Sequence, residues 1–120
     1  FTFEEFDLEG THRIMKKLSF PTLTITRTKH LRPDKYGINI SNVNATKLYG
    51  VSFVQKKLGV KREETIGVGD GYNDFPLLEA CGLKIAMGNA EEDLKAIADY
   101  IAPSVDEDGL VTVIEKYLSG

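Results

Sequence analysis

The chain has 120 residues, of which 42% are hydrophobic and 28% charged, and its formal net charge is −3. These values predict one ordinary soluble globular unit with a single core, and no apolar run approaches the roughly 18 residues of a membrane span. The first ten residues lack the regions of a signal peptide, and no arginine-rich run or aromatic platform indicates nucleic-acid binding. Phe1 in place of Met indicates a trimmed or partial chain. The single cysteine, Cys81, excludes an internal disulfide and favours the reducing cytoplasm.

The first third of the chain predicts one helix followed by two strands. Residues 11–20 place apolar side chains at helical spacing after Thr11, which we expect to be the N-cap. Residues 21–28 and 36–41 alternate apolar and polar side chains, as half-buried strands do, and the turn residues of 30–37 lie between them. The apolar residues of these two strands are Leu23, Ile25, Ile38 and Ile40. We predict that the strands pair as an antiparallel hairpin.

The next segments change from period two to helical periodicity. Residues 44–59 predict a helix that ends at Gly59, with one apolar face formed by Leu48, Val51 and Leu58. Two short apolar strands follow, at residues 64–70 and 83–88, and a brief helix with Pro76 in its first turn separates them.

The last part of the chain predicts two more helices with a strand between them. Residues 89–100 predict a helix in which Asn89 is the N-cap and Glu92 completes a capping box. A strand over residues 100–103 comes next. The final helix, residues 106–118, is expected to bury Leu110, Ile114 and Leu118.

Helices and short apolar strands therefore alternate from residue 37 onward, which is typical of a parallel sheet with covering helices. The hairpin before them is a different kind of element. We predict an α/β chain in two parts: residues 1–41, a helix plus an antiparallel hairpin, and residues 42–120, a Rossmann-like parallel sheet with covering helices.

The most informative stretch is "TIGVGDGYNDFPLLEACG", residues 65–82, in which acids, an asparagine and glycines follow an apolar strand. Ligands of parallel sheets bind beyond the carboxyl ends of the strands, where Asp70, Asn73 and Asp74 are expected to lie. Two carboxylates on a tight turn suit Mg²⁺, and the glycines let backbone N–H groups approach an anion. The alternative is a plain strand-to-helix turn, which needs fewer such residues.

A dinucleotide-binding motif fits this stretch less well. Gly67 and Gly69 match its first two glycines, but Tyr72 stands where the third is required. Asp70 would also repel a pyrophosphate unless a cation lay between them. We therefore reject this interpretation.

The stretches "GVGDGYND", "LLEACGLKIAMGNA" and "IADYIAPSVDEDGLVTVIEKYL" resemble the C-terminal half of haloacid dehalogenase-like (HAD) hydrolases, in particular the capped phosphatases that act on sugar phosphates and similar small phosphomonoesters. The resemblance covers about residues 37–119, and residues 1–36 would suit the end of the family's inserted cap. It implies that Asp70 is a direct Mg²⁺ ligand, that Asp74 supports the metal indirectly, and that Asn73 contacts the substrate phosphate. Lys47, eleven residues before Leu58-Gly59, corresponds to the family's phosphate-facing lysine, although Leu48 replaces the usual glycine after it.

The family's nucleophile has no counterpart in this sequence. HAD phosphatases attack phosphorus with the first Asp of a D-x-D loop after an N-terminal strand, and no such loop occurs here. The acids of "VDEDG", residues 105–109, open the last helix, and we interpret them as N-capping residues. The first three strands of the family's sheet are missing as well.

We therefore expect the metal- and phosphate-binding part of a Mg²⁺-dependent HAD-type phosphatase, with catalytic Lys47 and Asp70 and with the nucleophilic Asp outside this chain. Its ligand would be a small phosphorylated metabolite. The alternative is a non-catalytic module that binds Mg²⁺, a phosphorylated ligand or a partner. The strand at residues 65–69 would lack a neighbour, so we expect its edge to bind a missing N-terminal half or a second copy.

Overall fold

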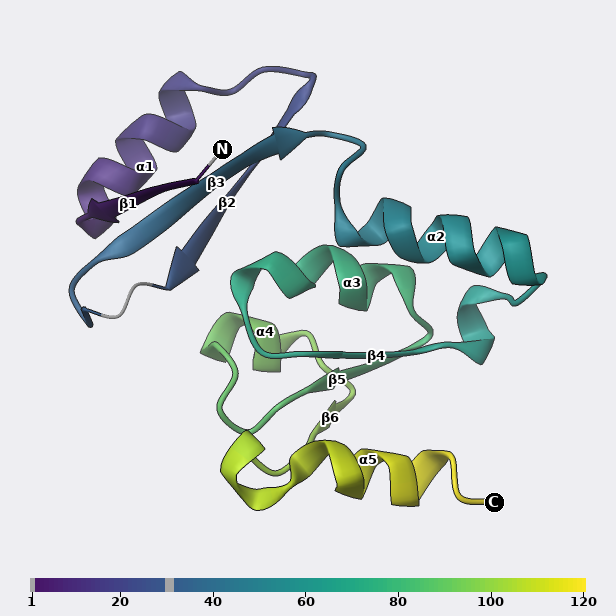
Figure 1. The fold of residues 1–120 in the computed structure, drawn as a ribbon. Coiled ribbons are helices and arrows are strands. Elements are labelled where there is room, and N and C mark those ends of the chain that lie inside the picture. The colour runs from purple at the N-terminus through teal and green to yellow at the C-terminus, as the bar shows by residue number, and fades with distance from the viewer. Residues whose placement is uncertain (1, 30–31) are drawn as a thin grey trace.

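The computed structural model describes residues 2–29 and 32–120 and contains two three-stranded sheets, ordered β1-β3-β2 and β4-β5-β6. Figure 1 shows the first sheet with α1 at one end of the molecule and the second sheet between α2, α3 and α4 on one side and α5 on the other. The α/β class and the parallel sheet with covering helices are confirmed. Within the described residues, no helix is long and apolar enough to cross a membrane.

The first sheet is antiparallel. It comprises β1 (Thr2–Phe6), β2 (Leu23–Lys29) and β3 (Tyr36–Asn42), and α1 (Leu8–Lys17) packs against it. The predicted hairpin is confirmed, because β2 and β3 pair in continuous register from Leu23↔Asn42 to Lys29↔Tyr36. Of the predicted turn between them, residues 30–31 lie outside the described residues. The strand β1, which pairs with the other edge of β3, was not predicted.

The predicted N-cap of α1 is wrong. The helix begins at Leu8, and the Asp7 carboxylate caps it by accepting a hydrogen bond from the Gly10 backbone N–H at 2.6 Å. Thr11 lies inside the helix, fully buried, and its hydroxyl donates to the Asp7 carbonyl at 2.8 Å. The helix begins before the first apolar residue of the predicted pattern, because the Asp7 carboxylate accepts from the Gly10 N–H, one of the N–H groups that a helix start leaves free.

The second sheet is parallel, with β4 (Ile66–Gly69), β5 (Leu83–Ala86) and β6 (Tyr100–Ile101). Its helices are α2 (Lys47–Leu58), α3 (Phe75–Ala80), α4 (Glu92–Ala96) and α5 (Gly109–Tyr117). Three 3₁₀ turns connect these elements: η1 (Arg62–Glu64), η2 (Tyr72–Asp74) and η3 (Val105–Glu107). Between the sheets, β3 ends at Asn42, and the division into domains at residues 41 and 42 stays a prediction.

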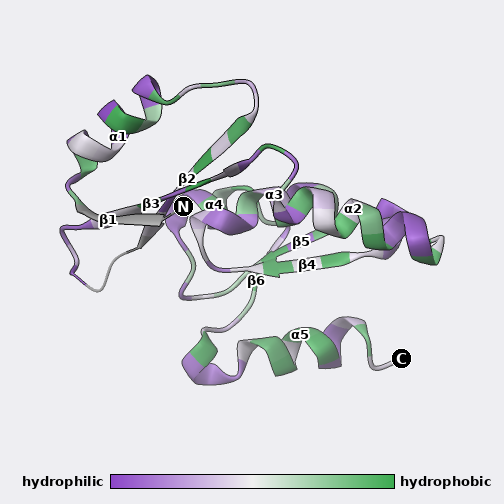
Figure 2. Ribbon diagram, turned by 45° about the horizontal axis from the view of Figure 1, so that its top comes forward, coloured by the Kyte–Doolittle hydropathy of each residue, from purple (hydrophilic) through white to green (hydrophobic). Residues whose placement is uncertain are grey.

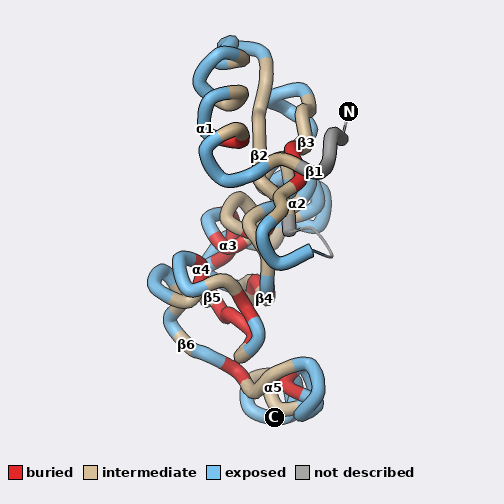
Figure 3. The backbone as a smooth tube through the Cα atoms, turned by 90° about the vertical axis from the view of Figure 1, so that its left-hand side faces the viewer, coloured by how far each residue is buried: buried red, intermediate tan, exposed pale blue. Residues whose placement is uncertain are grey.

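The core lies on both faces of the parallel sheet, because side chains alternate along a strand. On β5, Ala86 belongs to a cluster toward α3 and α4 that also holds Leu78, Ala90 and Leu94. Its neighbour Ile85 belongs to the opposite cluster, with Met87, Ala102 and, from α5, Val113. Figure 3 shows these buried stretches in red along the second sheet and its helices.

The predicted buried face of α5 is wrong, and the predicted apolar face of α2 is not fully buried. No residue of α2 is fully buried, and Leu58 is 71% exposed. On α5 the buried residues are Gly109 and Val113, whereas the three that we expected to be buried are exposed: Leu110, Ile114 and Leu118. The helix α2 packs mainly against α3, and α5 packs on the sheet through Val113, so each helix leaves apolar side chains exposed. Figure 2 shows green segments on both helices and a purple end on α2.

One edge of β4 has no strand partner within the described residues, and an apolar groove lies beside it. The groove runs between α2 and β4 and includes Val54 and Ile66.

We predict that the chain self-associates through this edge, exchanges elements with a second copy, or binds a missing N-terminal half. Sedimentation over a wide concentration range should show association, which Val54→Lys should weaken more than the control Ser52→Lys on the same helix. A sharp monomer at every concentration, with slow exchange at the amides of residues 65–69, would contradict this prediction.

Candidate functional site

The candidate site lies where β4 ends and α2 begins. The turn of residues 70–74 follows the carboxyl end of β4, and Lys47 is the first residue of α2, after the N-cap Thr46. The Thr46 hydroxyl accepts a hydrogen bond from the Tyr49 backbone N–H at 3.4 Å, which fixes the start of the helix. Lys47 thus enters the site from the N-terminal end of α2, and the acids come from the turn that precedes α3.

Asp74 is the buried centre of this arrangement, with 4% of the residue exposed. One carboxylate oxygen accepts a hydrogen bond from the Lys47 ammonium, and the two groups form an ion pair. The other oxygen accepts from the backbone N–H groups of Asp70 at 2.9 Å and Gly71 at 3.1 Å. Burial raises the pKa of the Asp74 carboxyl, but the bond to Lys47, the two N–H groups and the lysine charge outweigh it, so the net pKa is lowered. Asp74 is therefore held as a carboxylate.

Gly69 makes room for that carboxylate. A Cβ at this position would lie 2.5 Å from the Asp74 Cβ and 2.9 Å from its carboxyl carbon, closer than atoms can approach. Because Gly69 ends β4 without a side chain, the turn can fold back until Asp74 reaches the N–H groups of residues 70 and 71. This steric requirement accounts for the second glycine of "GVGD".

Asp70 differs from Asp74 because it is exposed. Its carboxylate accepts a hydrogen bond from the Asn89 side-chain Nδ2 at 3.4 Å, and the Asn89 side-chain Oδ1 accepts from the Val105 backbone N–H at 2.9 Å. The predicted capping role of Asn89 is wrong, because α4 begins at Glu92 with Glu91 at the N-cap position. Asn89 follows β5 as Asp70 follows β4, and the carboxyl ends of neighbouring parallel strands share one edge. The position of Asn89 after a predicted strand could therefore have indicated that it lies near Asp70.

An arginine from the first sheet contacts the turn of the second. The Arg27 guanidinium lies 4.2 Å from the centre of the Tyr72 ring and 4.9 Å from that of Tyr36. Tyr72 in turn stacks on Phe75, with ring centres 6.3 Å apart. Sequence reasoning missed Arg27, since nothing in a single strand indicates which distant ring its side chain will meet.

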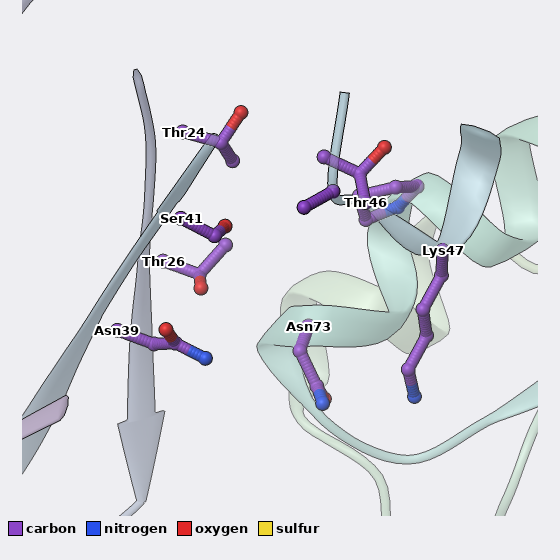
Figure 4. A pocket seen from close by; sticks show the side chains of 9 residues that line it. Thr24, Thr26, Asn39, Ser41, Thr46, Lys47 and Asn73 are labelled. Atoms are coloured by element: carbon purple, nitrogen blue, oxygen red, sulfur yellow. The ribbon is translucent and has the colours of Figure 1, made fainter. Parts of the chain in front are cut away.

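Two cavities lie between the first sheet and this turn. The larger, of about 460 Å³, is lined by Arg27, Asp70, Asn73 and Asn89 among others. The smaller, of about 190 Å³, holds Lys47 and Asn73 opposite strands β2 and β3, as Figure 4 shows. The structure thus brings Lys47, Asp70, Asn73 and Asp74 together, with Asn73 at the boundary of both cavities. The acids of residues 106–108 lie elsewhere, at η3, where Glu107 caps the turn through Ser104.

The two acids of the turn differ in how well they could bind a Mg²⁺ ion. Both oxygens of Asp74 already hold protein groups, whereas the exposed carboxylate of Asp70 faces the larger cavity. Among the described residues, no three His, Cys, Asp or Glu side chains form a metal-binding group. Mg²⁺ requires only one or two carboxylates and otherwise keeps water or substrate oxygens. Asp70 fits as the single direct ligand, and Asp74 fits a supporting role.

The chain is similar to known proteins of one family. The model of the haloacid dehalogenase-like hydrolase family matches residues 4–114, and the chain belongs to that family. It is similar to phosphoglycolate phosphatase 1 of Saccharolobus solfataricus, with 34% identity over 94 residues that cover 78% of this chain and 41% of the relative. A putative phosphatase of Haemophilus influenzae is 35% identical over 103 residues, covering 86% and 37%. The chain thus spans about two-fifths of the length of the curated relatives it matches.

The chain is also similar to solved structures of haloacid dehalogenase-like proteins. A haloacid dehalogenase-like hydrolase from B. subtilis superposes with a TM-score of 0.79 at 33% identity, over 98% of this chain and 39% of that one. The HAD subclass IIB sugar phosphatase BT4131 superposes with a TM-score of 0.76 at 31% identity, over 97% and 42%. The resemblance noted from the motifs is confirmed.

Replacing Gly69 tests the packing under Asp74. Gly69→Ala should lower the free energy of unfolding by about 1–3 kcal/mol, because the new methyl group overlaps the Asp74 side chain. The matched control is Gly50→Ala on α2, where an added Cβ meets nothing within 4 Å and where alanine should stabilise the helix by about 0.5–1 kcal/mol. Urea unfolding of the two variants measures both effects, and equal stabilities would contradict the proposed packing.

The lowered pKa of Asp74 predicts how stability depends on pH. A carboxyl group with a lowered pKa in the folded state stabilises the protein above its unfolded pKa of about 4, and the contribution is lost as the pH falls through the folded value. Asp74→Asn should therefore cost about 1–3 kcal/mol at pH 7, because the bond to Lys47 loses its charge, and progressively less in acid. Urea unfolding from pH 7 to pH 3 measures this difference. The exposed control Asp34→Asn should change the free energy of unfolding at pH 7 by less than about 0.5 kcal/mol. A loss of stability in Asp74→Asn that became larger as the pH fell would contradict the predicted pH dependence.

Proposed function

We propose that this chain is the metal- and phosphate-binding part of a Mg²⁺-dependent phosphatase that hydrolyses small phosphomonoesters, sugar phosphates among them. The observation that carries the proposal is the convergence of Lys47, Asp70 and Asn73 around the buried Asp74 at the carboxyl end of β4. Family membership and the names of the relatives support it, since they include phosphoglycolate phosphatases and a sugar phosphatase.

In the proposed reaction, Lys47 and Asn73 hold the phosphate of the substrate. Both side chains line the smaller cavity, and the Lys47 ammonium neutralises negative charge on the phosphoryl group as it is transferred. Lys47 is itself oriented by Asp74, so its charge is already in place before substrate arrives. The Asn73 amide adds a neutral donor beside it.

Asp70 would hold Mg²⁺ at the edge of the larger cavity, and the hydrogen bond from Asn89 would orient its carboxylate. When bound, the ion supplies positive charge that screens the approach of an anionic nucleophile to an anionic phosphate. Asp74 supports this part of the site through the backbone of residues 70 and 71.

The nucleophile in this proposal is an aspartate outside the chain, which would form an aspartyl-phosphate that water then hydrolyses. The sequence has no D-x-D loop after a strand, and the acids of residues 106–108 serve to cap η3. Residues 1–41 would be the end of the cap. We propose a cytoplasmic location, which a free thiol suits: the single cysteine of this chain, Cys81, is buried and unpaired.

A second candidate is a non-catalytic module that binds Mg²⁺, a phosphorylated ligand or a partner. The observation that favours it is the apolar groove beside β4, which suits a protein partner as well as a missing half. Reconstitution with a chain that carries a D-x-D loop distinguishes the two candidates, because a binding module would gain no activity.

The test is hydrolysis of a generic aryl phosphate. We expect no turnover above background by the chain alone, and Mg²⁺-dependent turnover once a chain with the D-x-D half is added. Asp70→Asn should lower that turnover by about 100-fold, whereas the matched control Asp106→Asn, in the acids at η3, should leave it unchanged. Steady turnover by the pure chain that is lost in Asp70→Asn would contradict the assignment of the nucleophile to another segment.

A further inference from the structure

The side chain of Asn89 connects the turn η3 to Asp70. Its Oδ1 accepts a hydrogen bond from the Val105 backbone N–H at 2.9 Å, and its Nδ2 donates to Oδ2 of the Asp70 carboxylate at 3.4 Å. The three residues follow three neighbouring strands, because Asp70 comes after β4, Asn89 after β5 and Val105 after β6. One side chain thus spans the carboxyl edge of the parallel sheet.

The Val105 N–H determines which way the Asn89 amide faces. A backbone N–H can only donate and a carboxylate can only accept, so the amide oxygen must face Val105 and the amide NH₂ group must face Asp70. The opposite orientation would bring two donors together at one end and two acceptors together at the other. The turn η3 therefore keeps a hydrogen-bond donor directed at Asp70.

The turn η3 is itself held close to the end of β5. A Cβ on Gly88, the residue before Asn89, would lie 2.8 Å from the Ser104 backbone nitrogen, so only glycine allows this approach. Among the residues that the structure describes, Asp108 at the end of η3 is the one non-glycine residue with a positive φ, 54°. Such a conformation costs free energy and persists only where the surrounding contacts require it. The Val105 N–H thus has a defined position relative to Asn89.

The simpler explanation is that Asn89 only caps η3 and that its contact with Asp70 is incidental. The turn already has a cap, because the Glu107 carboxylate accepts from the Ser104 backbone N–H at 3.1 Å and from the Ser104 hydroxyl at 2.8 Å. A cap for the Val105 N–H would also need only an acceptor, which an aspartate or a serine provides. An asparagine supplies a donor as well, and that donor faces the carboxylate.

We propose that η3 is a positioning element of the metal site: its Val105 N–H orients Asn89, and Asn89 holds Asp70 ready for a divalent cation. This inference rests on the proposed function, in which Asp70 is the direct Mg²⁺ ligand. Asn89 occupies Oδ2 of the Asp70 carboxylate, and no group among the described residues hydrogen-bonds to Oδ1. Oδ1 is therefore available to the ion, and a carboxylate that is already held by one oxygen loses less rotational freedom when the ion binds.

The experiment measures the Mg²⁺ dissociation constant of the 120-residue chain from the amide NMR shifts of residues 69–74. Val105→Pro removes the N–H that orients Asn89, and Ser104 before it already has the extended backbone that a residue preceding proline adopts, with φ −67° and ψ 169°. Mg²⁺ should bind about fivefold more weakly to this variant and about tenfold more weakly to Asn89→Ala, which lacks the donor to Asp70. The matched control Val105→Ala keeps the N–H and should change the dissociation constant by less than about twofold.

Two further measurements separate positioning from a merely structural effect. The midpoint of urea unfolding of Val105→Pro should stay near that of the unsubstituted chain, because the lost hydrogen bond and the reduced entropy of the unfolded chain oppose each other. In the unsubstituted chain, the Val105 amide signal should shift at the same Mg²⁺ concentrations as those of residues 69–74. Asn89→Ala should abolish the Val105 shift even at saturating Mg²⁺, since the connection to Asp70 is gone.

Each result decides between the alternatives. Equal Mg²⁺ affinity of Val105→Pro and Val105→Ala would overturn the positioning role of η3. Should Val105→Pro fail to fold, a Val105 amide that does not respond to Mg²⁺, or that responds equally in Asn89→Ala, would overturn it independently. If residues 69–74 of the unsubstituted chain did not respond to Mg²⁺, the proposed metal site itself would be wrong, and this inference would be overturned with it.

Discussion

The buried carboxylate of Asp74 is the contact on which the rest of the site depends. It joins Lys47, 27 residues earlier in the chain, to the backbone N–H groups of the turn after β4. Since α2 buries no residue completely, polar contacts hold the helix at both ends: this ion pair at its start and Gln55 near its end. The Gln55 amide donates to the Ala80 carbonyl at 2.9 Å and to the Thr65 hydroxyl at 3.0 Å. The first turn of α2 therefore has a fixed position relative to the sheet.

With α2 in this position, the charged side chains of the site lie in different surroundings. Asp74 is buried, and its carboxylate is paired with Lys47 and with backbone N–H groups. It therefore holds the turn in place and does not line either cavity. Asp70 is exposed at the edge of one cavity, and Lys47 and Asn73 line the other. The first sheet covers both cavities and contributes Arg27 to one and uncharged side chains to the other. Arg27 and the uncharged side chains of the first sheet thus line different cavities.

The sequence predicted the elements whose local pattern determines them. Gly59 ends α2 in the left-handed conformation, with φ at 69°, and the short apolar strands of 64–70 and 83–88 appear as β4 and β5. The errors arise where distant packing decides. Apolar spacing on α5 could not indicate that Val113, and not Leu110 or Ile114, faces the sheet, because the helix is apolar on several sides. Asn89 has the local signature of a cap, but the neighbouring strand brings Asp70 within reach of it. Lys47, Asp70, Asn73 and Asp74 lie together as the motifs predicted, whereas their roles stay predictions.

We propose that the turn after β4 holds a divalent cation through Asp70. This binding can be measured by titrating Mg²⁺ into the chain and following its backbone amide NMR shifts. With one carboxylate ligand and a shell completed by water, binding should be weak, on the order of millimolar. The shift changes should centre on residues 69–74 and should be lost in Asp70→Asn. Changes centred on residues 106–108 and absent from residues 69–74 would contradict it.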